Sequence, residues 1–354
     1  MTEKLSHTEE NGAEDGAPVT PKPNLASNLV GKTINGWLVE RKISKDGGTG
    51  GAFSSGYVVR DENGRRAFMK AINIGYAIKM WKGVNRTDLI NEITAEFKYE
   101  REILEFCGRN KMDRIVRAID SGEYDEPSDP YFVPYLVFEF SEEGDVRRHK
   151  RMSDPDLVWR LRIFHGICVG VRQLHGRHIA HQDLKPSNVL VFDRDVSKIG
   201  DLGRCTLKGS KVDDPAHCGD LDYTPIELHY AHYYPDWDVR RKGADLYMLG
   251  GLLAFLVANV HIFGLVLSKL PGKYHPRNWG AARYSEALPA VRAATYDAIA
   301  EIVAAVPAEL QGEIRDLLCW LCDPEPQLRG HPKTGVGVAV IDSHWSASLA
   351  LLTI

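Results

Sequence analysis

The decisive stretch of this sequence reads HQDLKPSN at residues 181–188, VLVF at 189–192 and GDLG at 200–203. It sets two aspartates, a lysine and an asparagine around a short apolar run that is typical of a β-strand. Phosphoryl transfer asks a protein mainly to align the reactants and to cancel phosphate charge. An aspartate can orient an attacking hydroxyl, a lysine can meet a phosphate, and an asparagine with an aspartate can hold magnesium. The pattern therefore indicates a phosphoryl-transfer site.

The same stretch resembles the catalytic and metal-binding loops of the eukaryotic-like (Hanks-type) protein kinases. HQD at 181–183 stands where that family usually has His-Arg-Asp, and DLG at 201–203 stands where Asp-Phe-Gly is usual. A single polar residue of this kind is usually a turn or cap, but the ordered string is specific. The resemblance implies ATP and Mg²⁺ as cofactors and a protein substrate. It implies these roles: catalytic base for Asp183, phosphate contact for Lys185, and magnesium ligands for Asn188 and Asp201.

Features upstream resemble the nucleotide-binding half of that family. The run GGTGGAFSSG at 47–56 is glycine-rich, and glycines let backbone amides approach phosphate oxygens, although a flexible hairpin is an open alternative. Glu100 best matches the helix glutamate that pairs with the nucleotide-binding lysine, with Glu96 and Glu102 as alternatives. Phe138 would lie at the back of the adenine pocket. By resemblance the ATP-binding residues are Gly48, Gly50, Gly51, Lys70, Glu100, Glu139 and Phe140 (through their backbone), and Asp145 at the ribose.

The order of elements predicts an α+β, bilobal, protein-kinase-like fold. Strand-like pieces occur at 37–39, 56–59, 67–70, 115–119 and 135–140, with a hairpin signal at Asn63-Gly64 and a loop at 123–130. Helical periodicity occupies 87–107 and 157–174, the latter ending near Gly176. We expect a flexible tail at 1–30, an N-lobe at 31–140 with a small antiparallel β-sheet and one main helix, a larger α-helical C-lobe at 141–330, and an unplaced tail at 331–354.

Further matches lie downstream. Pro225-Ile226-Glu227 resembles the family's Ala-Pro-Glu, and Glu227 would pair with Arg329. The apolar run 246–267 is long enough to span a bilayer, but it contains Asn259 and His261, which would be costly in lipid. By resemblance Asp245 opens a buried central helix, and we interpret the run as that helix and its continuation.

The composition narrows the class of protein. The chain has 354 residues, 44% of them hydrophobic, which allows one two-lobed domain. A net charge of −4 gives no electrostatic case for nucleic acid or an anionic membrane as main partner. Six dispersed cysteines and no secretory signal favour a cytoplasmic protein. Cys319 and Cys322 form a CxxC, which we interpret as buried cysteines rather than a redox or zinc pair.

Several positions depart from the family pattern. Gln182 replaces an arginine that normally binds a phosphorylated activation loop, so we expect activity without that switch. Phe68 stands where a small alanine usually roofs adenine and Gly56 where valine is expected, so either the glycine makes room or the pocket is altered. Asp220 occupies the position of a threonine. Lys185 still favours Ser/Thr over Tyr specificity.

These departures keep two other functions open: a pseudokinase that serves as a binding or scaffolding module, and a small-molecule phosphotransferase of related fold. The segment 74–91 is longer than the family minimum and would be either an extra packing helix or a partner-binding face. A compact chain with GDLDY at 219–223 looks more like a soluble bacterial-type Ser/Thr kinase than an animal-type one.

Overall fold

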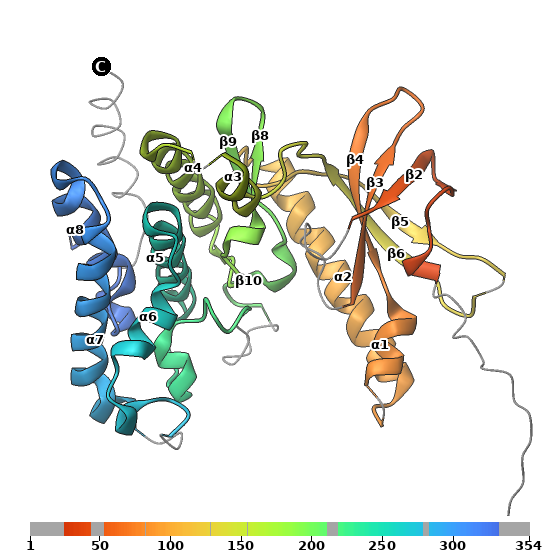
Figure 1. Ribbon diagram of the computed structural model, residues 1–354. Coiled ribbons are helices and arrows are strands. Elements are labelled where there is room, and N and C mark those ends of the chain that lie inside the picture. The colour runs from red at the N-terminus through yellow and green to blue at the C-terminus, as the bar shows by residue number, and fades with distance from the viewer. Residues whose placement is uncertain are drawn as a thin grey trace, which may run out of the picture.

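The computed structural model describes residues 25–43, 53–81, 83–127, 129–153, 155–210, 219–278 and 283–332. A strand-rich lobe and a helical lobe lie side by side, joined after β6 (Val133–Glu139) (Figure 1). The predicted fold class is therefore confirmed. The predicted N-terminal tail of 1–30 extends too far, because Leu25, Ala26 and Leu29 are buried in the N-lobe core. These apolar residues stand among polar neighbours, which hid them in the sequence.

The N-lobe sheet has six antiparallel strands in the order β1-β2-β3-β4-β6-β5. The strands other than β6 are β1 (Thr33–Ile34), β2 (Trp37–Lys42), β3 (Ser54–Arg60), β4 (Arg66–Ile72) and β5 (Ala118–Tyr124). Asn63 and Gly64 lie in the β3–β4 hairpin, where Gly64 has a φ of 82° and Asp61 accepts hydrogen bonds from the backbone of Asn63 and Arg65. The hairpin signal in the sequence is thus confirmed.

Strand β5 lies further along the chain than the strand predicted at 115–119. Ile115 and Val116 are buried in the core of the larger lobe, and Ile115 forms an isolated bridge with Ile199. The strand itself begins at Ala118 and ends at Tyr124, so the loop predicted at 123–130 begins two residues too early. As an edge strand, β5 carries polar residues that a search for apolar runs passes over.

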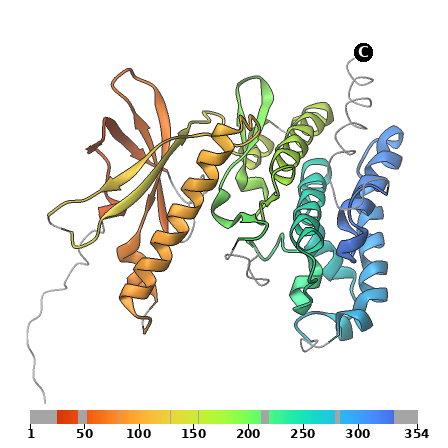
Figure 2. The same cartoon turned by 180° about the vertical axis from the view of Figure 1, so that it is seen from behind.

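Helix α2 (Arg86–Arg109) crosses one face of the sheet and carries Glu100 (Figures 1 and 2). The Asn85 side chain caps it by accepting from the Thr87 amide at 2.9 Å. The shorter α1 (Ile74–Met80) occupies the long segment before it. Ile74 and Ala77 of α1 are buried, whereas Met80 is exposed, so this segment both packs and presents an apolar surface.

The C-lobe is built mainly from helices around α5 (Gly243–Ala258), which is apolar on all sides and mostly buried. Helix α4 (Leu157–His175) begins at the Asp156 cap and ends at Gly176, close to the prediction. The other helices are α3 (Val146–Ser153), α6 (Ile262–Lys269), α7 (Tyr284–Ala304) and α8 (Gln311–Cys322). Two short two-stranded antiparallel sheets lie between this bundle and the N-lobe (Figure 1): β8 (Val189–Phe192) with β9 (Val196–Ile199), and β7 (Ile179–Ala180) with β10 (Thr206–Leu207).

The apolar run 246–267 forms the buried helix α5 and its continuation α6, and these two helices are not collinear. Asn259 ends α5 in the left-handed conformation, with a φ of 59°, and α6 leaves at a bend of 92°. Across the described residues, no single helix is both long and apolar enough to cross a membrane. The helical segments Asp238–Ala258 and Ile262–Lys269 reach that length and apolar composition only when they are taken together, with the bend between them.

The CxxC pair lies on α8. Cys322 is fully buried and Cys319 is half-buried, and both are free thiols. Burial raises the pKa of the Cys322 thiol to about 12, so it remains a protonated, inert thiol at neutral pH. Within the part of the chain that the structure describes, three or more His, Cys, Asp or Glu side chains nowhere gather as a metal cluster. Cys322 is thus buried as expected, whereas Cys319 is only half-buried.

Candidate active site

Lys70, Glu100 and Asp201 meet between the lobes. The Lys70 ammonium lies 2.9 and 3.0 Å from the two carboxylate oxygens of Glu100 and 3.1 Å from Oδ1 of Asp201. Lys70 comes from β4, Glu100 from α2, and Asp201 from the turn after β9, so three distant segments converge. Of the three candidate glutamates, Glu100 is the one that contacts the lysine, while Glu96 and Glu102 are exposed.

The charges of this cluster are strongly interdependent. Burial lowers the pKa of Lys70, but the carboxylates of Asp201 and Glu100 outweigh this effect and raise it above its ordinary value. Burial would raise the pKa of Asp201, yet Lys70 holds it below its ordinary value. The pKa of Glu100 is raised, because burial outweighs the attraction of Lys70. The lysine is therefore firmly cationic, as a phosphate-binding group must be.

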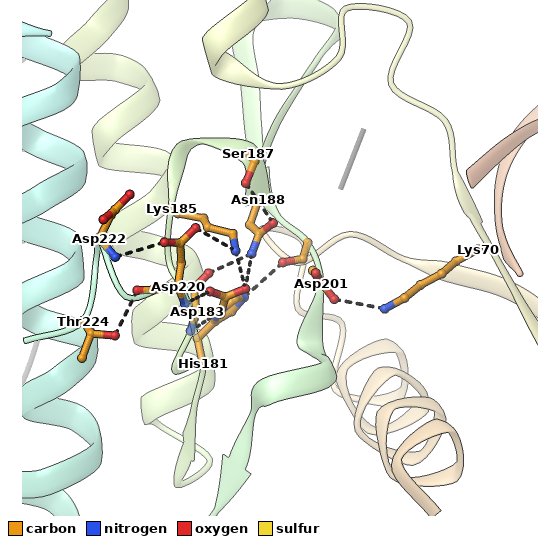
Figure 3. Close-up of polar contacts among 11 residues, drawn as sticks. Lys70, His181, Asp183, Lys185, Ser187, Asn188, Asp201, Asp220, Asp222 and Thr224 are labelled. Carbon is orange, nitrogen blue, oxygen red and sulfur yellow. Dashed lines mark hydrogen bonds and ion pairs between the residues drawn. The ribbon is translucent and has the colours of Figure 1, made fainter. Parts of the chain in front are cut away.

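A second cluster surrounds Asp183 (Figure 3). Asn188 donates from Nδ2 to the Asp183 carbonyl at 2.8 Å and to its Oδ2 at 3.0 Å, while the Lys185 ammonium lies 3.1 Å from the same Oδ2. The turn Pro186–Asn188 places Asn188 directly before β8. The sequence HQDLKPSN thus folds back on its own aspartate.

Asp245, at the start of α5, holds the loop in this shape. Its carboxylate accepts the backbone N–H of His181 at 2.7 Å and that of Gln182 at 2.8 Å, and it contacts His175 Nε2 at 2.8 Å. Burial would raise the pKa of Asp245, but the hydrogen bond and charge of His175 keep it below its ordinary value. Gln182 adopts a φ of 66°, a conformation unusual for a residue with a side chain, which these bonds support.

Sequence reasoning missed how Gly219 and Asp220 approach the catalytic loop. The Asp220 amide donates to Oδ1 of Asp183 at 3.0 Å, and the Asp220 carboxylate lies 3.5 Å from the Lys185 ammonium. A Cβ on Gly219 would lie only 2.1 Å from Asp183 Oδ1, so only glycine fits there. From the sequence, Asp220 stood out only as a departure from the family's threonine. The signal that could have revealed the close approach to Asp183 was the glycine directly before it.

The cleft has a wide end and a narrow end that share Lys70, Glu100 and Asp201. The wide end is a cavity of about 430 Å³ whose lining includes Asp183, Lys185, Asp220, Phe53, Trp81 and Arg204. The narrow end is a cavity of about 30 Å³. Its lining adds Phe68, Val116, Phe138, Glu139, Leu190 and Gly200.

The remaining predicted ATP-binding residues are distributed unevenly. Gly48, Gly50 and Gly51 lie outside the described residues. Glu139 lines the narrow end, with its carboxylate 2.8 Å from Lys198 Nζ, and Phe140 follows it half-buried.

Asp145, predicted at the ribose, is bonded to the start of α3. Its carboxylate accepts from the amides of Arg147 and Arg148 at the start of α3 and pairs with the Arg147 guanidinium at 2.8 Å. The described residues that line the two cavities do not include it.

The predicted pair of Glu227 and Arg329 forms inside the C-lobe. The Arg329 guanidinium lies 2.6 and 2.9 Å from the two carboxylate oxygens of Glu227, and both side chains are buried. Burial lowers the pKa of Arg329, but the Glu227 charge raises it above its ordinary value. The bidentate geometry ties the segment after residue 219 to the end of α8.

Comparison with known proteins agrees with this geometry. The protein kinase domain model matches residues 63–336, and the chain belongs to the protein kinase family, which confirms the resemblance noted in residues 181–203. Similar proteins include serine/threonine-protein kinase atg1 of Dictyostelium discoideum, 26% identical over 63% of this chain and 32% of that protein. Aurora kinase of Debaryomyces hansenii is 25% identical over 72% of this chain and 53% of that protein. This chain therefore spans about a third to a half of the length of these two relatives.

Proposed function

We propose that this protein is an ATP-dependent kinase that transfers the γ-phosphoryl group to Ser or Thr hydroxyls of other proteins. The observation that carries the proposal is the convergence of Lys70, Asp183, Lys185 and Asp201 on one cavity of about 430 Å³. The relatives named as serine/threonine-protein kinases, and the lysine at position 185, support the Ser/Thr preference. The proposed setting is the cytoplasm, where the described free cysteines would remain reduced.

The donor atoms at this site fit magnesium. Lys70 contacts Oδ1 of Asp201, and Asn188 donates through its nitrogen, so the second carboxylate oxygen and the amide oxygen are the donors a metal would use. Hard oxygen donors of this kind, completed by phosphate oxygens, suit Mg²⁺. Bound there, Mg²⁺ would neutralise charge on the transferring phosphates.

The side chains divide the remaining work. Lys70, held by Glu100, would bind the α and β phosphates, and Lys185 would meet the transferring group. Asp183 would orient the acceptor hydroxyl and take its proton. Asp220 adds a carboxylate beside Lys185, so Lys185 is shared between Asp183 and Asp220 at 3.1 and 3.5 Å until a phosphate arrives.

The test is a γ-phosphate transfer assay on purified protein with ATP, Mg²⁺ and a generic protein substrate. Asp183→Asn should lower transfer about 10²- to 10⁴-fold, the usual contribution of a general base, and should leave ATP binding intact. Asp297→Asn, an exposed change on α7, is the matched control and should retain full activity.

A pseudokinase, which keeps the fold as a binding or scaffolding module, is the second candidate. It is favoured by the small volume of about 30 Å³ at the narrow end of the cleft, the base end, where the adenine base would bind. A thermal shift with ATP and Mg²⁺ separates the two, because a ligand that binds only the native state raises its melting temperature. A shift accompanied by transfer supports the kinase. No shift at millimolar nucleotide, together with no transfer, would assign the chain to the scaffolding class.

A further inference from the structure

At the narrow end of the cleft, β4 carries a large side chain at Phe68 and β3 carries none at Gly56, the reverse of the family pattern. We propose that Phe68 and Gly56 form one linked determinant of nucleotide binding: the base stacks on the Phe68 ring, and Gly56 is the residue that lets the ring lie there. This inference rests on the proposed function, because it concerns the same cleft. In this proposal the purine base, and not the phosphates, contacts Phe68, and the pairing of Phe68 with Gly56 is particular to this chain.

The sheet register brings the two residues to the same face. Gly56 pairs with Lys70 across β3 and β4, and Val58 pairs with Phe68 in the same ladder. Residues two apart on a strand share a face, so Gly56, Phe68 and Lys70 all face the cleft that Lys70 lines. The Phe68 ring therefore lies beside the lysine expected to hold the phosphates.

The contact between them leaves no room for a Cβ at position 56 unless the Phe68 ring moves. A Cβ placed on Gly56 would lie 2.8 Å from Cε2 and 3.1 Å from Cζ of Phe68. Carbon atoms that are not bonded prefer separations of about 3.5–4.0 Å. The Phe68 ring thus occupies the space that a side chain at position 56 would otherwise fill, and the two positions cannot both be large.

The ring has a neighbour on β6 as well. Its centroid lies 6.1 Å from that of Phe138, with the planes inclined by 36°, within the usual range for aromatic pairs. Because Phe68 contacts Gly56 and also lines the cavity, a side chain at 56 would displace the ring into that cavity. The cavity holds only about 30 Å³, which leaves no space to absorb such a shift.

The lining is largely apolar and aromatic, and with a free volume of about 30 Å³ it would admit a flat base only if Phe68 and Leu190 move apart. Phe68 lies on the N-lobe side, Leu190 of β8 on the C-lobe side, and Phe138 and Val116 close the back. A base between Phe68 and Leu190 gains stacking on one face and apolar contact on the other. Stacking rewards the larger π face of a purine, and the cavity continues past Lys70 to the phosphate end. The fitting ligand is a purine nucleoside triphosphate.

A double-mutant cycle tests the linkage, with ATP affinity measured by titration. Gly56→Val should weaken ATP binding on the order of 10- to 100-fold, because residues in contact couple strongly. Phe68→Ala should weaken it about 10-fold through the lost stacking. The double variant carries its larger side chain on β3 instead of β4. It should bind ATP with an affinity within about threefold of that of the natural chain, which would be a strongly non-additive result.

Two controls isolate the base. Inorganic tripolyphosphate, a probe without a base, should bind all four proteins within about twofold, because the phosphate end is untouched. Gly264→Val, an exposed site on α6 with nothing within 4 Å of an added Cβ, should leave ATP binding unchanged. Unfolding midpoints without nucleotide confirm that each variant folds.

Three results would overturn the inference. Additive losses in the double variant would show that the two positions act separately. Tighter ATP binding by Phe68→Ala would show that the ring obstructs the base, and equal losses of ATP and tripolyphosphate would show a general distortion. These outcomes differ from failure of the proposed function: ATP binding with no transfer contradicts only the kinase activity, whereas transfer that is indifferent to these substitutions contradicts only the linkage.

Discussion

The two ends of the cleft are stabilised by different forces. At the phosphate end, charged groups face one another at hydrogen-bond distances, with Lys70 between Glu100 and Asp201 and Lys185 between Asp183 and Asp220. At the base end, apolar groups pack closely around a cavity of about 30 Å³. Charge networks accept few substitutions, because each removed partner leaves a buried charge unpaired.

Apolar packing follows a looser rule. It conserves total volume rather than particular residues, so a large side chain can move from one strand to its neighbour. That difference accounts for the exchange of volume between Phe68 and Gly56 at the base end. At the phosphate end Asp183, Lys185, Asn188 and Asp201 match the family pattern, and Asp220 is the departure.

Lys70→Met should have the largest effect on stability. It leaves the carboxylates of Glu100 and Asp201 without their cation, and removing one partner of a buried pair costs about 3–5 kcal/mol. Urea unfolding at neutral pH measures the change. Lys79→Met, an exposed change on α1, should stay within about 0.5 kcal/mol of the natural chain.

The stability gap between the natural chain and Lys70→Met should also depend on pH. The pKa of Asp201 is lowered in the folded protein, so its contribution is complete above the ordinary value of 3.8 and disappears as pH falls through the lower folded value. The pKa of Lys70 is raised, so its contribution is complete below 10.5 and disappears as pH rises through the higher folded value. A gap that stayed constant across this range would show that the cluster is not the source.

Much of the fold was predictable because local signals agreed with one another. Asn63-Gly64 specified a hairpin, and the periodic segment at 157–174 specified a helix that runs from Leu157 to His175. The errors arose where the environment decides the conformation. Ile115 reads as part of a strand yet packs in the core of the larger lobe, and Asn259 ends α5 in a left-handed conformation within a run that is otherwise mostly apolar.

The candidate site was likewise predictable only in part. The spacing within residues 181–203 predicted which side chains would gather, and the structure brings Lys70, Asp183 and Asp201 to one cavity. The sequence could not show what else each group contacts. That Asp145 is bound by Arg147, or that Gly219 lies against the Asp183 carboxylate, depends on segments folding back on one another.

Asp145→Ala tests the predicted ribose contact and should have a moderate effect. Because the carboxylate caps α3 and pairs with Arg147, its loss should cost about 1 kcal/mol of stability. ATP affinity should change less than about threefold, since that carboxylate is already bonded to α3. Asp156→Ala, which removes the cap of α4 away from the cleft, is the matched control for stability. A large loss of ATP affinity in Asp145→Ala alone would instead support the ribose contact.

The smallest effect is expected from dephosphorylation. In many kinases the residue before the catalytic aspartate is an arginine that binds a phosphate on the activation segment, but Gln182 is fully buried here. Its side-chain nitrogen donates to the Arg241 carbonyl and to Asp245 Oδ1, each at 2.9 Å, and its oxygen accepts from Arg241 at 3.1 Å. A neutral, buried amide offers no electrostatic partner to a phosphate, so phosphatase treatment should alter the transfer rate less than about twofold.

Mass spectrometry must confirm that phosphate was removed, and heat-inactivated phosphatase serves as the parallel control. Activity that is lost on treatment and recovered after incubation with ATP would contradict this account. It would mean that another cation takes over the role of the missing arginine. Retained activity would instead indicate that Asp245, through its bonds to the backbone of His181 and Gln182, holds the loop in its active shape without a phosphate.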